Sequence, residues 1–382
     1  MPYDKPHAVS PGLWALAWRR LRADGVAMVS LTIVAAFLLL MVLSGTGLIA
    51  KNWSKEVGVN YAPPSFVGAD AETSGNAAAP TSPSASSAES EAPTELPVVD
   101  PLADALAAIR GEIRGETQKS ETSGVPAADS ASVDPLADVM ADIRAKGSKA
   151  EEVEARATTL PFGGDKWGRD VLKKVIKGSE TSIFVGLAAA VVATFLGTLF
   201  GAIAGYYGRW LDDIFNWFYS VFTSIPYLLL ILAVAAVLQQ KGTFTIILIL
   251  GLTGWTGCFR LIRGEYLKHK GREYVQAADA IGASNARRMF VHIFPNISHV
   301  VLVQLSILVV AFIKSEVILS FLGFGVPVDV VSWGSMLNEA QNELILGKWW
   351  QLAAAGTAMA LLVTAFSLFT DALRDALDPK LK

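Results

Sequence analysis

The few side chains that could do chemistry in this 382-residue chain are scattered rather than grouped. The single cysteine, Cys258, lies in an apolar run, so neither an intrachain disulfide nor a cysteine-based metal site can form. His269, His292 and His299 are dispersed in or beside one polar segment, and no nucleophile in an apolar stretch has a recognisable base beside it. We therefore expect no catalytic residue and no metal site.

A phosphate-cradling loop is also missing from the sequence. The pattern of Gly, four residues, Gly-Lys and Ser or Thr does not occur, and no strand-helix alternation carries an acidic metal ligand. We therefore expect this chain to bind no cofactor, ATP and Mg²⁺ included.

Two charged residues, Lys314 and Glu316, interrupt a long apolar stretch at 297–321. A charge at mid-bilayer costs at least about 2.5 kcal/mol unless it faces a cavity or a partner. Residues two apart point to different sides of a helix, so the two are not expected to pair with each other. We expect both to lie in protein or near the membrane edge.

The elements that must position these side chains are membrane spans. The chain is 52% apolar and only 18% charged, with a mean hydropathy of +0.42. A helix needs roughly 20 mostly apolar residues to cross a bilayer. Six stretches qualify, at 26–49, 182–207, 215–238, 243–261, 297–321 and 350–369. The first is longer than the core of a cleaved signal, so we expect it to be an uncleaved anchor.

Pro226 falls inside the third stretch. A proline removes one backbone hydrogen bond and is tolerated in a span where its neighbours satisfy the freed groups. Two interpretations stay open: a kink that shapes a cavity, or simple packing.

Lysines and arginines indicate the orientation, because short cytoplasmic segments are rich in them. The N-terminal flank, Arg209, the 260–288 segment and the C-terminal tail all fall on one side, which we expect to be the cytoplasm. Five basic residues contradict this pattern, although long translocated segments are largely exempt from the rule. They are Lys166, Arg169, Lys173, Lys174 and Lys177.

An acidic insert separates the first two stretches. Residues 51–160 hold twice as many acidic as basic side chains, and 69–159 is rich in Ala, Ser, Pro, Glu and Asp. Such a composition predicts disorder over most of the insert. VDPLADALAAIR at 99–110 recurs as VDPLADVMADIR at 133–144, and each copy has the pattern of one helix. The copies are either transient helices in a tether or docking peptides for a partner.

A polar segment at 262–296 separates the fourth and fifth stretches. Gly282 would let another surface approach the backbone, and Ser284 or Asn285 can cap a following helix. The side chains expected to form one short helix are Ala277, Ala278, Ala280 and Ile281. Such a helix could fit a groove on another protein, or it could lie on lipid headgroups because its flanks are basic.

The string PFGGDKWGRDVL at 161–172 resembles a motif of the permeases of bacterial peptide and nickel ABC importers. We call its matching residues the Gly-Arg-Asp motif: Gly164, Asp165, Gly168, Arg169 and Asp170. The resemblance continues at 197–208, 225–226, 251–265, 273–284, 319–326, 332–337 and 371–379. It covers nearly the whole chain except the insert and the first 25 residues.

The 262–296 segment resembles the loop through which these permeases contact their ATPases. The family pattern is Glu-Ala-Ala, three residues, Gly, and then an ending in Leu-Pro. This chain keeps the spacing but has Gln276 for Glu, His292 for Ile and Phe294 for Leu. The resemblance assigns ATPase coupling to Gln276, Ala277, Ala278, Ile281, Gly282, Ala283, Ser284 and Pro295. It also favours a place beside the translocation path for Glu316 and Pro226.

The resemblance implies an all-α fold with six transmembrane helices, of the type I ABC importer permease kind. It implies a bacterial inner-membrane protein with both termini in the cytoplasm, and a transport subunit rather than an enzyme. The implied partners are a second homologous permease, two ATPase subunits that bind ATP and Mg²⁺, an extracytoplasmic substrate-binding protein and lipid, with no nucleic acid. Di- or oligopeptides are the first candidate substrates, with nickel, glutathione or another small solute as alternatives.

Two other classes of protein remain as alternatives. A secondary transporter usually repeats its topology, and the six stretches show no obvious duplication. An intramembrane enzyme would need a nucleophile with a base inside the spans. We expect this domain order: cytoplasmic segment 1–25, first span 26–49, extracytoplasmic insert 50–160, family motif segment 161–181, five-helix core 182–373 with coupling loop 262–296, and cytoplasmic tail 374–382.

Overall fold

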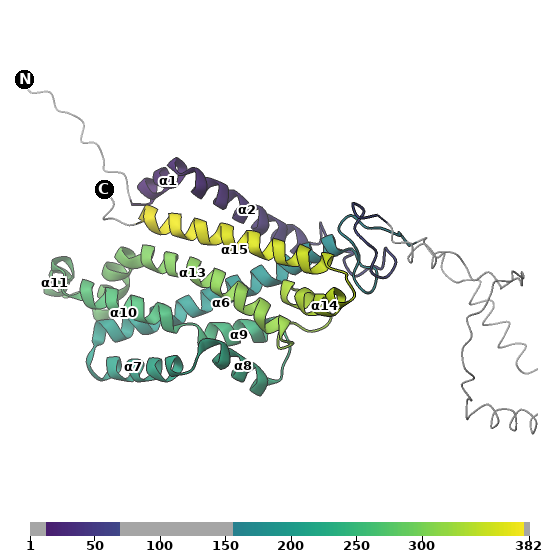
Figure 1. Cartoon of the computed structure of the whole chain (residues 1–382). Helices are drawn as coiled ribbons and strands as arrows, with labels where there is room; N and C mark the ends of the chain where they lie inside the picture. The colour runs from purple at the N-terminus through teal and green to yellow at the C-terminus, as the bar shows by residue number, and fades with distance from the viewer. Residues whose placement is uncertain (1–12, 69–155, 378–382) are drawn as a thin grey trace, which may run out of the picture. The chain divides into compact units, whose positions relative to one another are not determined.

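The computed structural model describes residues 13–68 and 156–377, and the described part is built from helices with only isolated β-bridges between loops (Figure 1). These described residues belong to one unit of the chain. The predicted insert with its duplication, the first twelve residues and the last five lie outside them. The helices are α1 (Leu13–Ala23), α2 (Gly25–Gly45), α6 (Val171–Tyr207), α7 (Arg209–Ser224), α8 (Tyr227–Leu238), α9 (Thr243–Thr253), α10 (Thr256–Lys270), α11 (Glu273–Ala280), α12 (Asn285–Arg287), the π-helical turn η1 (Arg288–Ile293), α13 (Phe294–Phe321), α14 (Trp333–Ile345) and α15 (Trp350–Leu377).

Helix α6 is the central element, and it packs against α2, α9, α10 and α13 (Figure 1). Three glycines four residues apart face α10, so that the two backbones can approach closely. A Cβ atom on Gly197 would lie 2.6 Å from the Cβ of Cys258, and one on Gly201 would lie 2.8 Å from the carbonyl oxygen of Phe259. A Cβ on Gly205 would lie 2.6 Å from the carbonyl oxygen of Arg263. We call these three residues the glycine ladder.

Four helices or helix runs are long and apolar enough to cross a membrane, and two bent helix pairs raise the number to six among the described residues. The expectation of six spans therefore agrees with the structure when each bent pair counts as one. The long spans are Gly25–Gly45, Val171–Tyr207, Asn285–Phe321 and Trp350–Leu377. Several differ from the expected boundaries, because polar helix ends extend beyond the apolar stretches.

The second span is eleven residues longer than expected. It starts at Val171 rather than at 182, because Asp170 caps its N-terminus by accepting hydrogen bonds from the backbone N–H groups of Leu172 (2.9 Å) and Lys173 (3.4 Å). The expected boundary at 181/182 is therefore wrong as the start of a helix. The first turns, which carry three lysines, belong to the same continuous helix.

The third and fourth stretches are broken helices rather than continuous spans. Helices α7 and α8 meet at 88° across Ile225 and Pro226, and α9 and α10 meet at 40° across Gly254 and Trp255. Pro226 breaks the helix as predicted. The break at Gly254 was not predicted; there a Cβ atom would lie 2.3 Å from the ring of Phe312 on α13.

Two helices, α1 and α14, were not predicted. Helix α1 precedes the first span and buries Ala17 and Leu21 against the end of α15. Helix α14 starts with a capping box, in which Ser332 and Ser335 each accept a hydrogen bond from the other's backbone N–H (3.2 and 3.0 Å). Both segments contain apolar residues at helical spacing, but each is too short and too polar to be a span.

Residues 46–68 and 156–170 form a small cap of turns beside the N-termini of α6 and α15. The Gly-Arg-Asp motif builds much of it. Asp165 is fully buried, and its Oδ1 atom accepts hydrogen bonds from the backbone N–H groups of Trp167 (2.9 Å) and Arg169 (3.0 Å). Gly168 has a φ of +75°, and a Cβ there would lie 2.0 Å from the carbonyl oxygen of Gly58. The indole N–H of Trp350 donates to the carbonyl oxygen of Gly164 (2.7 Å), which ties α15 to the motif.

A buried charge cluster lies behind this cap. The ammonium group of Lys174 donates to Asp165 (2.8 Å), to Glu339 and to the side-chain oxygen of Gln351 (3.3 Å). Lys174 was one of the basic residues that contradicted the expected orientation. Its charge is matched by carboxylates from the motif and from α14, so it offers no free positive charge to the surface.

Glu343 on α14 lies close to this cluster and is buried. One of its oxygens accepts a hydrogen bond from the backbone N–H of Lys166 (3.3 Å), and the other has no partner. Burial raises the pKa of Glu343 to about 7; the charge of Lys174 opposes this shift, and those of Asp165 and Glu339 add to it. The folded chain therefore keeps a proton at this site that an exposed glutamate would lose at lower pH.

We predict that Glu343→Gln flattens the pH dependence of stability. The stability that the raised pKa provides is complete below about pH 4.5 and is lost as the pH rises through about 7. The wild-type chain should lose up to about 3 kcal/mol between these limits, whereas the variant, which carries no charge at position 343, should lose less. Thermal unfolding of the full chain in detergent, from about pH 5 to about pH 8, measures both.

Glu56→Gln is the matched control, because the carboxyl group of Glu56 is exposed and paired with Arg156 at 2.5 Å. It should leave the wild-type pH profile unchanged. Equal slopes for wild type and Glu343→Gln would contradict the assignment of a buried proton to Glu343.

Candidate functional site

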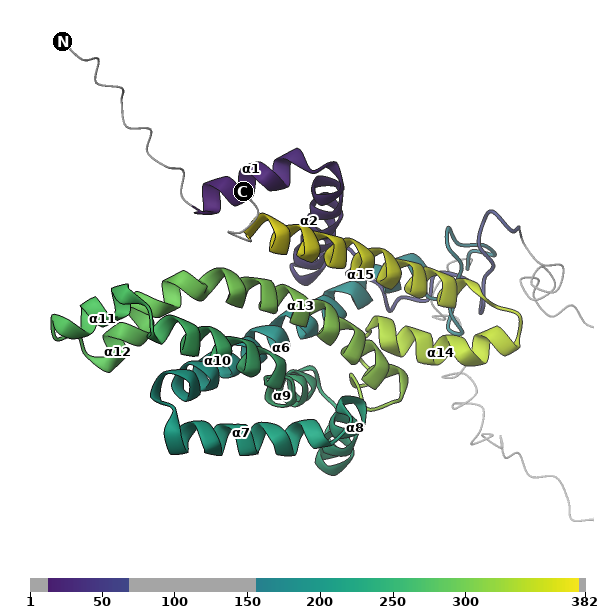
Figure 2. The same ribbon diagram turned by 60° about the vertical axis from the view of Figure 1, so that its left-hand side comes forward.

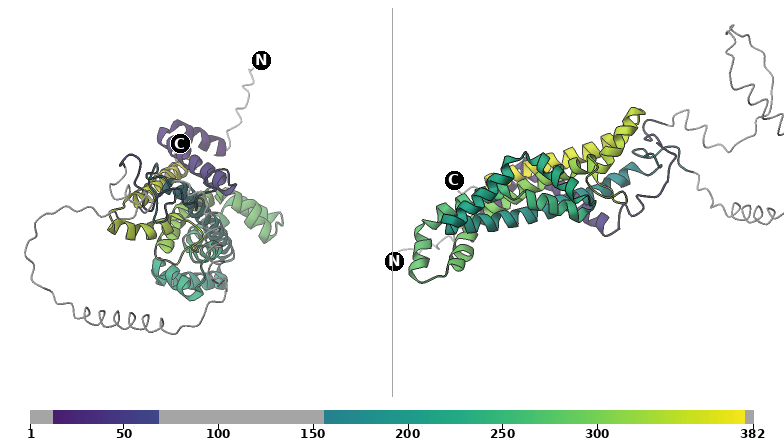
Figure 3. Two further views of the ribbon diagram at one scale, coloured as in Figure 1. Left: turned by 90° about the vertical axis from the view of Figure 1, so that its right-hand side faces the viewer. Right: turned by 90° about the horizontal axis from the view of Figure 1, so that it is seen from below.

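The segment that joins α10 to α13 is a compact hairpin of short helices at one end of the bundle. It contains α11, the single turn α12 and the π-helical turn η1 (Figure 2). The right-hand view of Figure 3 places these green helices at the end opposite the cap. The expected short helix therefore exists, and it spans Glu273–Ala280.

The hairpin is anchored by its own small apolar core. Val275, Ala278, Met289 and Ile293 are buried, and they connect α11 to η1 and to the start of α13. Below them, the Tyr266 hydroxyl on α10 donates to the carbonyl oxygen of Met289 (3.2 Å). The hairpin is thus joined to the helix that packs along the glycine ladder.

The turn after α11 depends on a glycine. Gly282 has a φ of +83°, which disfavours residues with a Cβ atom, although the space around it is open. The backbone N–H of Gly282 donates to the carbonyl oxygen of Asp279 (2.8 Å), and the backbone N–H of Ala283 donates to the carbonyl oxygen of Ala278 (3.0 Å). These two hydrogen bonds close the end of α11. Ser284 caps the next helix by accepting from the backbone N–H of Arg287 (3.3 Å), one of the two predicted caps.

Side chains also tie the hairpin to the end of α6. The Tyr206 hydroxyl donates to the side-chain oxygen of Asn285 (3.0 Å), and the guanidinium of Arg288 lies over the Tyr206 ring. Arg288 forms an ion pair with Asp279 (2.5 Å) and donates to Asn285. Sequence analysis missed this set, because no sequence spacing connects Tyr206 to residues in another segment.

An aromatic contact supports the first turn of α11. The Tyr274 hydroxyl lies 2.8 Å from the Nδ1 atom of His269 on α10. Burial raises the pKa of Tyr274, and hydrogen bonding to Asn296 and the charge of Arg272 oppose this shift. The hydroxyl therefore stays protonated near neutral pH, and it can keep this contact.

The outward face of α11 is formed by Gln276, Ala277, Ala280 and Ile281, all of which are exposed. Ile281 is 84% exposed, a large apolar side chain with almost no contact to its own chain. Ala278 does not belong to this face: it is buried inside the hairpin, so a direct contact between its side chain and a partner does not fit the structure. Gln276, which replaces the family glutamate, donates to the carbonyl oxygen of Gly271 (3.4 Å).

Pro295 lies in the first turn of α13, directly after η1. A proline is tolerated there because a first-turn residue needs no intrahelical N–H partner. The π-helical turn before it inserts an extra residue per turn, and such turns often mark functional positions. Pro295 therefore fixes the point at which the hairpin continues into a membrane-spanning helix.

Glu316 lies far from this hairpin, in the second half of α13. It is fully buried; Ser320 donates to one of its oxygens (2.7 Å), and the other oxygen has no hydrogen-bond partner. Ser182 on α6 and Ser332 at the start of α14 border the carboxyl group. Lys314 is exposed. Glu316 thus occupies a joint between three helices and lines none of the described pockets.

The structure does not bring the three predicted groups of residues together. The outward face of α11 lies at one end of the bundle, the Gly-Arg-Asp motif lies in the cap at the other end, and Pro226 lies at the bend between α7 and α8 (Figure 1). No group of three or more His, Cys, Asp or Glu side chains suited to a metal occurs in the described ranges. Geometrically, the α11 hairpin is an exposed surface that is anchored to α6 and α10.

Two family models match the sequence of this chain. The family model described as "Binding-protein-dependent transport system inner membrane component" matches residues 197–382, which include the hairpin and α13. A second model, the N-terminal TM domain of oligopeptide transport permease C, matches residues 12–64. The residues that it matches include α1, α2 and the first part of the cap.

Curated relatives align over more than half of the chain. The dipeptide transport system permease protein DppC of Bacillus subtilis (strain 168) is 38% identical over 221 residues, which are 58% of this chain and 69% of the relative. The oligopeptide transport system permease protein OppC of the same organism is 38% identical over 221 residues, 58% of this chain and 72% of the relative. OppC of Haemophilus influenzae is 34% identical over 219 residues, 57% of this chain and 70% of the relative.

The helical fold with its broken spans, the two family models and the length of these alignments lead to one assignment. The chain is a multi-pass membrane protein that belongs to the family of binding-protein-dependent transport system inner membrane components.

Proposed function

We propose that this chain is a permease subunit of an ATP-driven importer and that its substrates are di- or oligopeptides. The family membership supports transport, and the printed names of the relatives support peptides. The chain would form the translocation path together with a second permease of similar fold. Nickel, glutathione or another small solute stays the alternative substrate class.

The observation that carries the proposal is the exposed Ile281 on an otherwise anchored hairpin. A large apolar side chain that is 84% exposed is suited to filling a pocket on a partner. The small residues around it, Ala277 and Ala280, would let the surface of an ATPase come close to α11. Motion of the ATPase would then reach α6 through the hydrogen bond between Tyr206 and Asn285. It would reach α10 through the hydrogen bond from Tyr266 to Met289.

In this proposal the hairpin faces the cytoplasm, since ATPases act there, and both chain ends lie on the same side. The cap with the Gly-Arg-Asp motif then faces the extracytoplasmic side, where a substrate-binding protein would deliver its ligand. ATP and Mg²⁺ would bind to two ATPase subunits and not to this chain. Stimulation of a copurified ATPase by a peptide-loaded binding protein tests the function. Stimulation by a binding protein loaded with nickel or glutathione, but not by one loaded with peptide, would favour the alternative.

We predict that Ile281→Asp detaches or uncouples the ATPases. The charge would be placed in an apolar contact, and a loss of at least tenfold in ATPase retention is expected. Folding of the chain itself should be unaffected because Ile281 is exposed. Pull-down of the ATPases from detergent reports attachment, and ATP turnover with the binding protein present reports coupling.

Ile345→Asp is the matched control, because Ile345 is also 84% exposed but lies at the end of α14, away from the hairpin. It should leave both readouts at wild-type values. The proposal fails if Ile281→Asp retains both activities.

A bulky replacement of Gly282, such as Gly282→Trp, is also expected to uncouple the ATPase. Because Gly282 has a φ of +83°, that replacement also adds backbone strain. The Ile281 variant therefore separates docking from folding more cleanly.

We further propose that the joint around Glu316 takes part in the transport motion of α13 and α14. Glu316→Gln keeps the volume and the hydrogen bond from Ser320 but removes the ionisable group. We expect transport to fall severalfold while the complex still assembles, because a buried carboxyl group with one unpaired oxygen is sensitive to movement of its neighbours. Uptake into proteoliposomes and gel filtration of the complex measure the two effects. Normal uptake by the variant would refute a role for the ionisable group.

A further inference from the structure

Arg169 of the Gly-Arg-Asp motif holds its guanidinium group against two indole rings. Its Cζ atom lies 5.6 Å from the centre of the Trp53 ring and 5.9 Å from the centre of the Trp167 ring. Within residues 13–68 and 156–377 the guanidinium forms no ion pair, and its buried Nε atom has no hydrogen-bond partner. The rings therefore fix the position of a cation whose N–H donors the described residues leave unused.

Lys166 brings a second cation to one of these rings. Its ammonium group lies 5.4 Å from the centre of the Trp167 ring. Lys166 is exposed and forms no ion pair in the part of the chain that the structure describes, and Trp167 is 48% exposed. We call Trp53, Lys166, Trp167 and Arg169 the cation–indole site. Tryptophan and arginine are residue types that often dominate the binding energy of protein interfaces.

The acidic side chains of the cap already have other partners. The cap contains five basic and three acidic residues. Glu56 forms an ion pair with Arg156 at 2.5 Å. Asp165 is buried and paired with Lys174, and Asp170 caps α6. The cap thus has an excess of positive charge, so a ligand of the cation–indole site has to supply the negative charge itself.

The length of α6 places the cation–indole site beyond the lipid headgroups. Glu180 is the last charged residue of α6, so the hydrocarbon core begins no earlier than this position. The helix rises about 14 Å from Val171 to Glu180, and about 11 Å of this remains along the membrane normal at a tilt of about 40°. A headgroup layer is only roughly 5 to 8 Å thick. Arg169 comes just before this helix, so water-soluble molecules can reach it.

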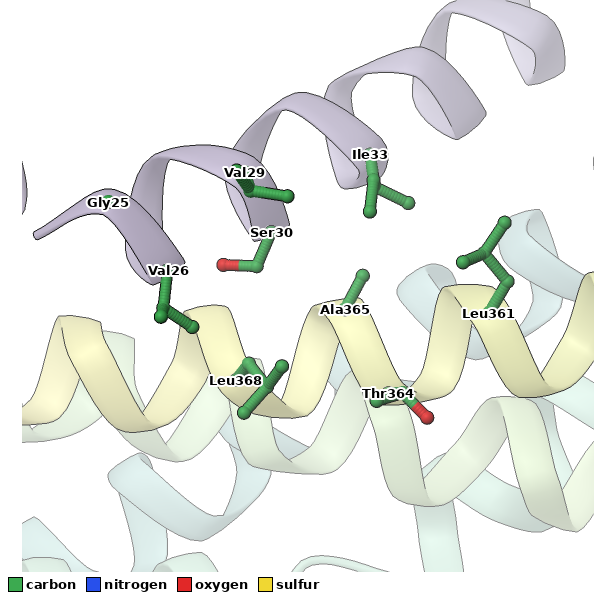
Figure 4. Close-up of a pocket in the computed structure, with 9 residues that line it drawn as sticks. All are labelled: Gly25, Val26, Val29, Ser30, Ile33, Leu361, Thr364, Ala365 and Leu368. Atoms are coloured by element: carbon green, nitrogen blue, oxygen red, sulfur yellow. The ribbon is translucent and has the colours of Figure 1, made fainter.

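The outer surface of the spans has a different character. The groove between α2 and α15 is lined by exposed apolar side chains such as Val26 and Leu361, and no charged side chain lines it (Figure 4). Such a surface fits lipid. The cations and indoles of the cap fit a polar ligand instead.

The shape of the cation–indole site favours a protein over a small anion. Lys166, Trp167 and Arg169 line none of the described pockets, so the site is part of a surface and not a cavity. A free anion at this surface would keep most of its water, and exposed ion pairs are weak. A protein would cover the exposed indole of Trp167, exclude water and strengthen the ion pair.

We propose that the cation–indole site receives a side-chain carboxylate, of Asp or Glu, from the surface of a water-soluble protein that docks on the cap. The guanidinium of Arg169 donates charge-assisted hydrogen bonds to this carboxylate. Lys166 adds a second positive charge, and Trp167 packs on the partner's surface around the acidic residue. The identity of the partner rests on the proposed function, which places the substrate-binding protein on this side of the membrane.

The first test uses the full chain in neutral detergent at low salt and two fluorescent peptides with blocked ends, Glu-Gly-Glu-Gly-Glu and Gln-Gly-Gln-Gly-Gln. Fluorescence anisotropy measures the affinity of each peptide. We expect the Glu peptide to bind at least about tenfold more tightly than the Gln peptide. Arg169→Gln should weaken binding of the Glu peptide at least about fivefold, and Arg169→Lys should weaken it nearly as much, because lysine has no planar fork of donors.

Lys173→Gln is the matched control for net charge. Lys173 lies 4.0 Å from Asp170 and over no indole ring among the described residues, so its removal should change the affinity less than about twofold. Trp167→Leu keeps an apolar side chain but removes the ring, and it should weaken binding about threefold. Thermal unfolding verifies that each variant is folded. Trp167→Leu changes a side chain that is half exposed, so it carries the test if Arg169→Gln does not fold.

The second test uses the assembled complex with its copurified ATPases and the peptide-loaded binding protein. Arg169→Gln should raise at least about fivefold the concentration of binding protein that gives half-maximal stimulation of ATP turnover. Turnover without the binding protein should stay at the wild-type value. A wild-type complex that shows no stimulation would contradict the proposed function, whereas the peptide measurements would still decide on the site.

Equal affinities of the wild type and Arg169→Gln for the Glu peptide would overturn the site. An equal loss of affinity in Lys173→Gln would do the same, since it would show an effect of net charge alone. Unchanged stimulation of Arg169→Gln by the binding protein would overturn the assignment of the partner. If dihexanoyl-phosphatidylglycerol displaces the Glu peptide at concentrations at which free glutamate does not, the site binds a lipid phosphate, and the docking proposal is wrong.

Discussion

Close contact between α6 and α10 is the constraint on which the rest of the structure depends. In a bilayer, helices gain little from burying apolar side chains, so association relies on packing at short distance. The glycine ladder at Gly197, Gly201 and Gly205 permits that distance, since a Cβ at any of the three positions would overlap α10. Helix α6 then serves as the common surface on which α2, α9 and α13 also pack.

This contact determines where the α11 hairpin lies. Helix α10 follows the ladder to its end and carries Tyr266, which holds the π-helical turn through the carbonyl oxygen of Met289. Helix α6 ends at the same level with Tyr206, which holds Asn285. The hairpin is therefore attached to both members of the closest helix pair, while Ile281 stays exposed at its tip. A force applied at α11 would move the core helices rather than a loop alone.

The sequence predicts the spans, the break at Pro226, the short helix and the Ser284 cap, because each depends on local composition or spacing. It does not predict what depends on contacts distant in sequence. Ala278 points inward only because η1 packs behind α11, and the ring of Phe312 in α13 leaves no room for a Cβ atom at Gly254. The charge of Lys174 is compensated only because Asp165 and Glu339 form ion pairs with it in the folded chain. Helices α1 and α14 were missed since each is shorter and more polar than a membrane span.

The central claim is that the tip of the α11 hairpin docks on an ATPase, and disulfide cross-linking tests it most directly. Cys258 is the single cysteine of the chain and is fully buried, so a cysteine introduced at Ile281 would be the accessible one. Ile281→Cys should cross-link to a cysteine engineered in the ATPase groove, in the assembled complex, whereas Ile345→Cys should not. Cross-linking from position 345 but not from 281 would contradict the account.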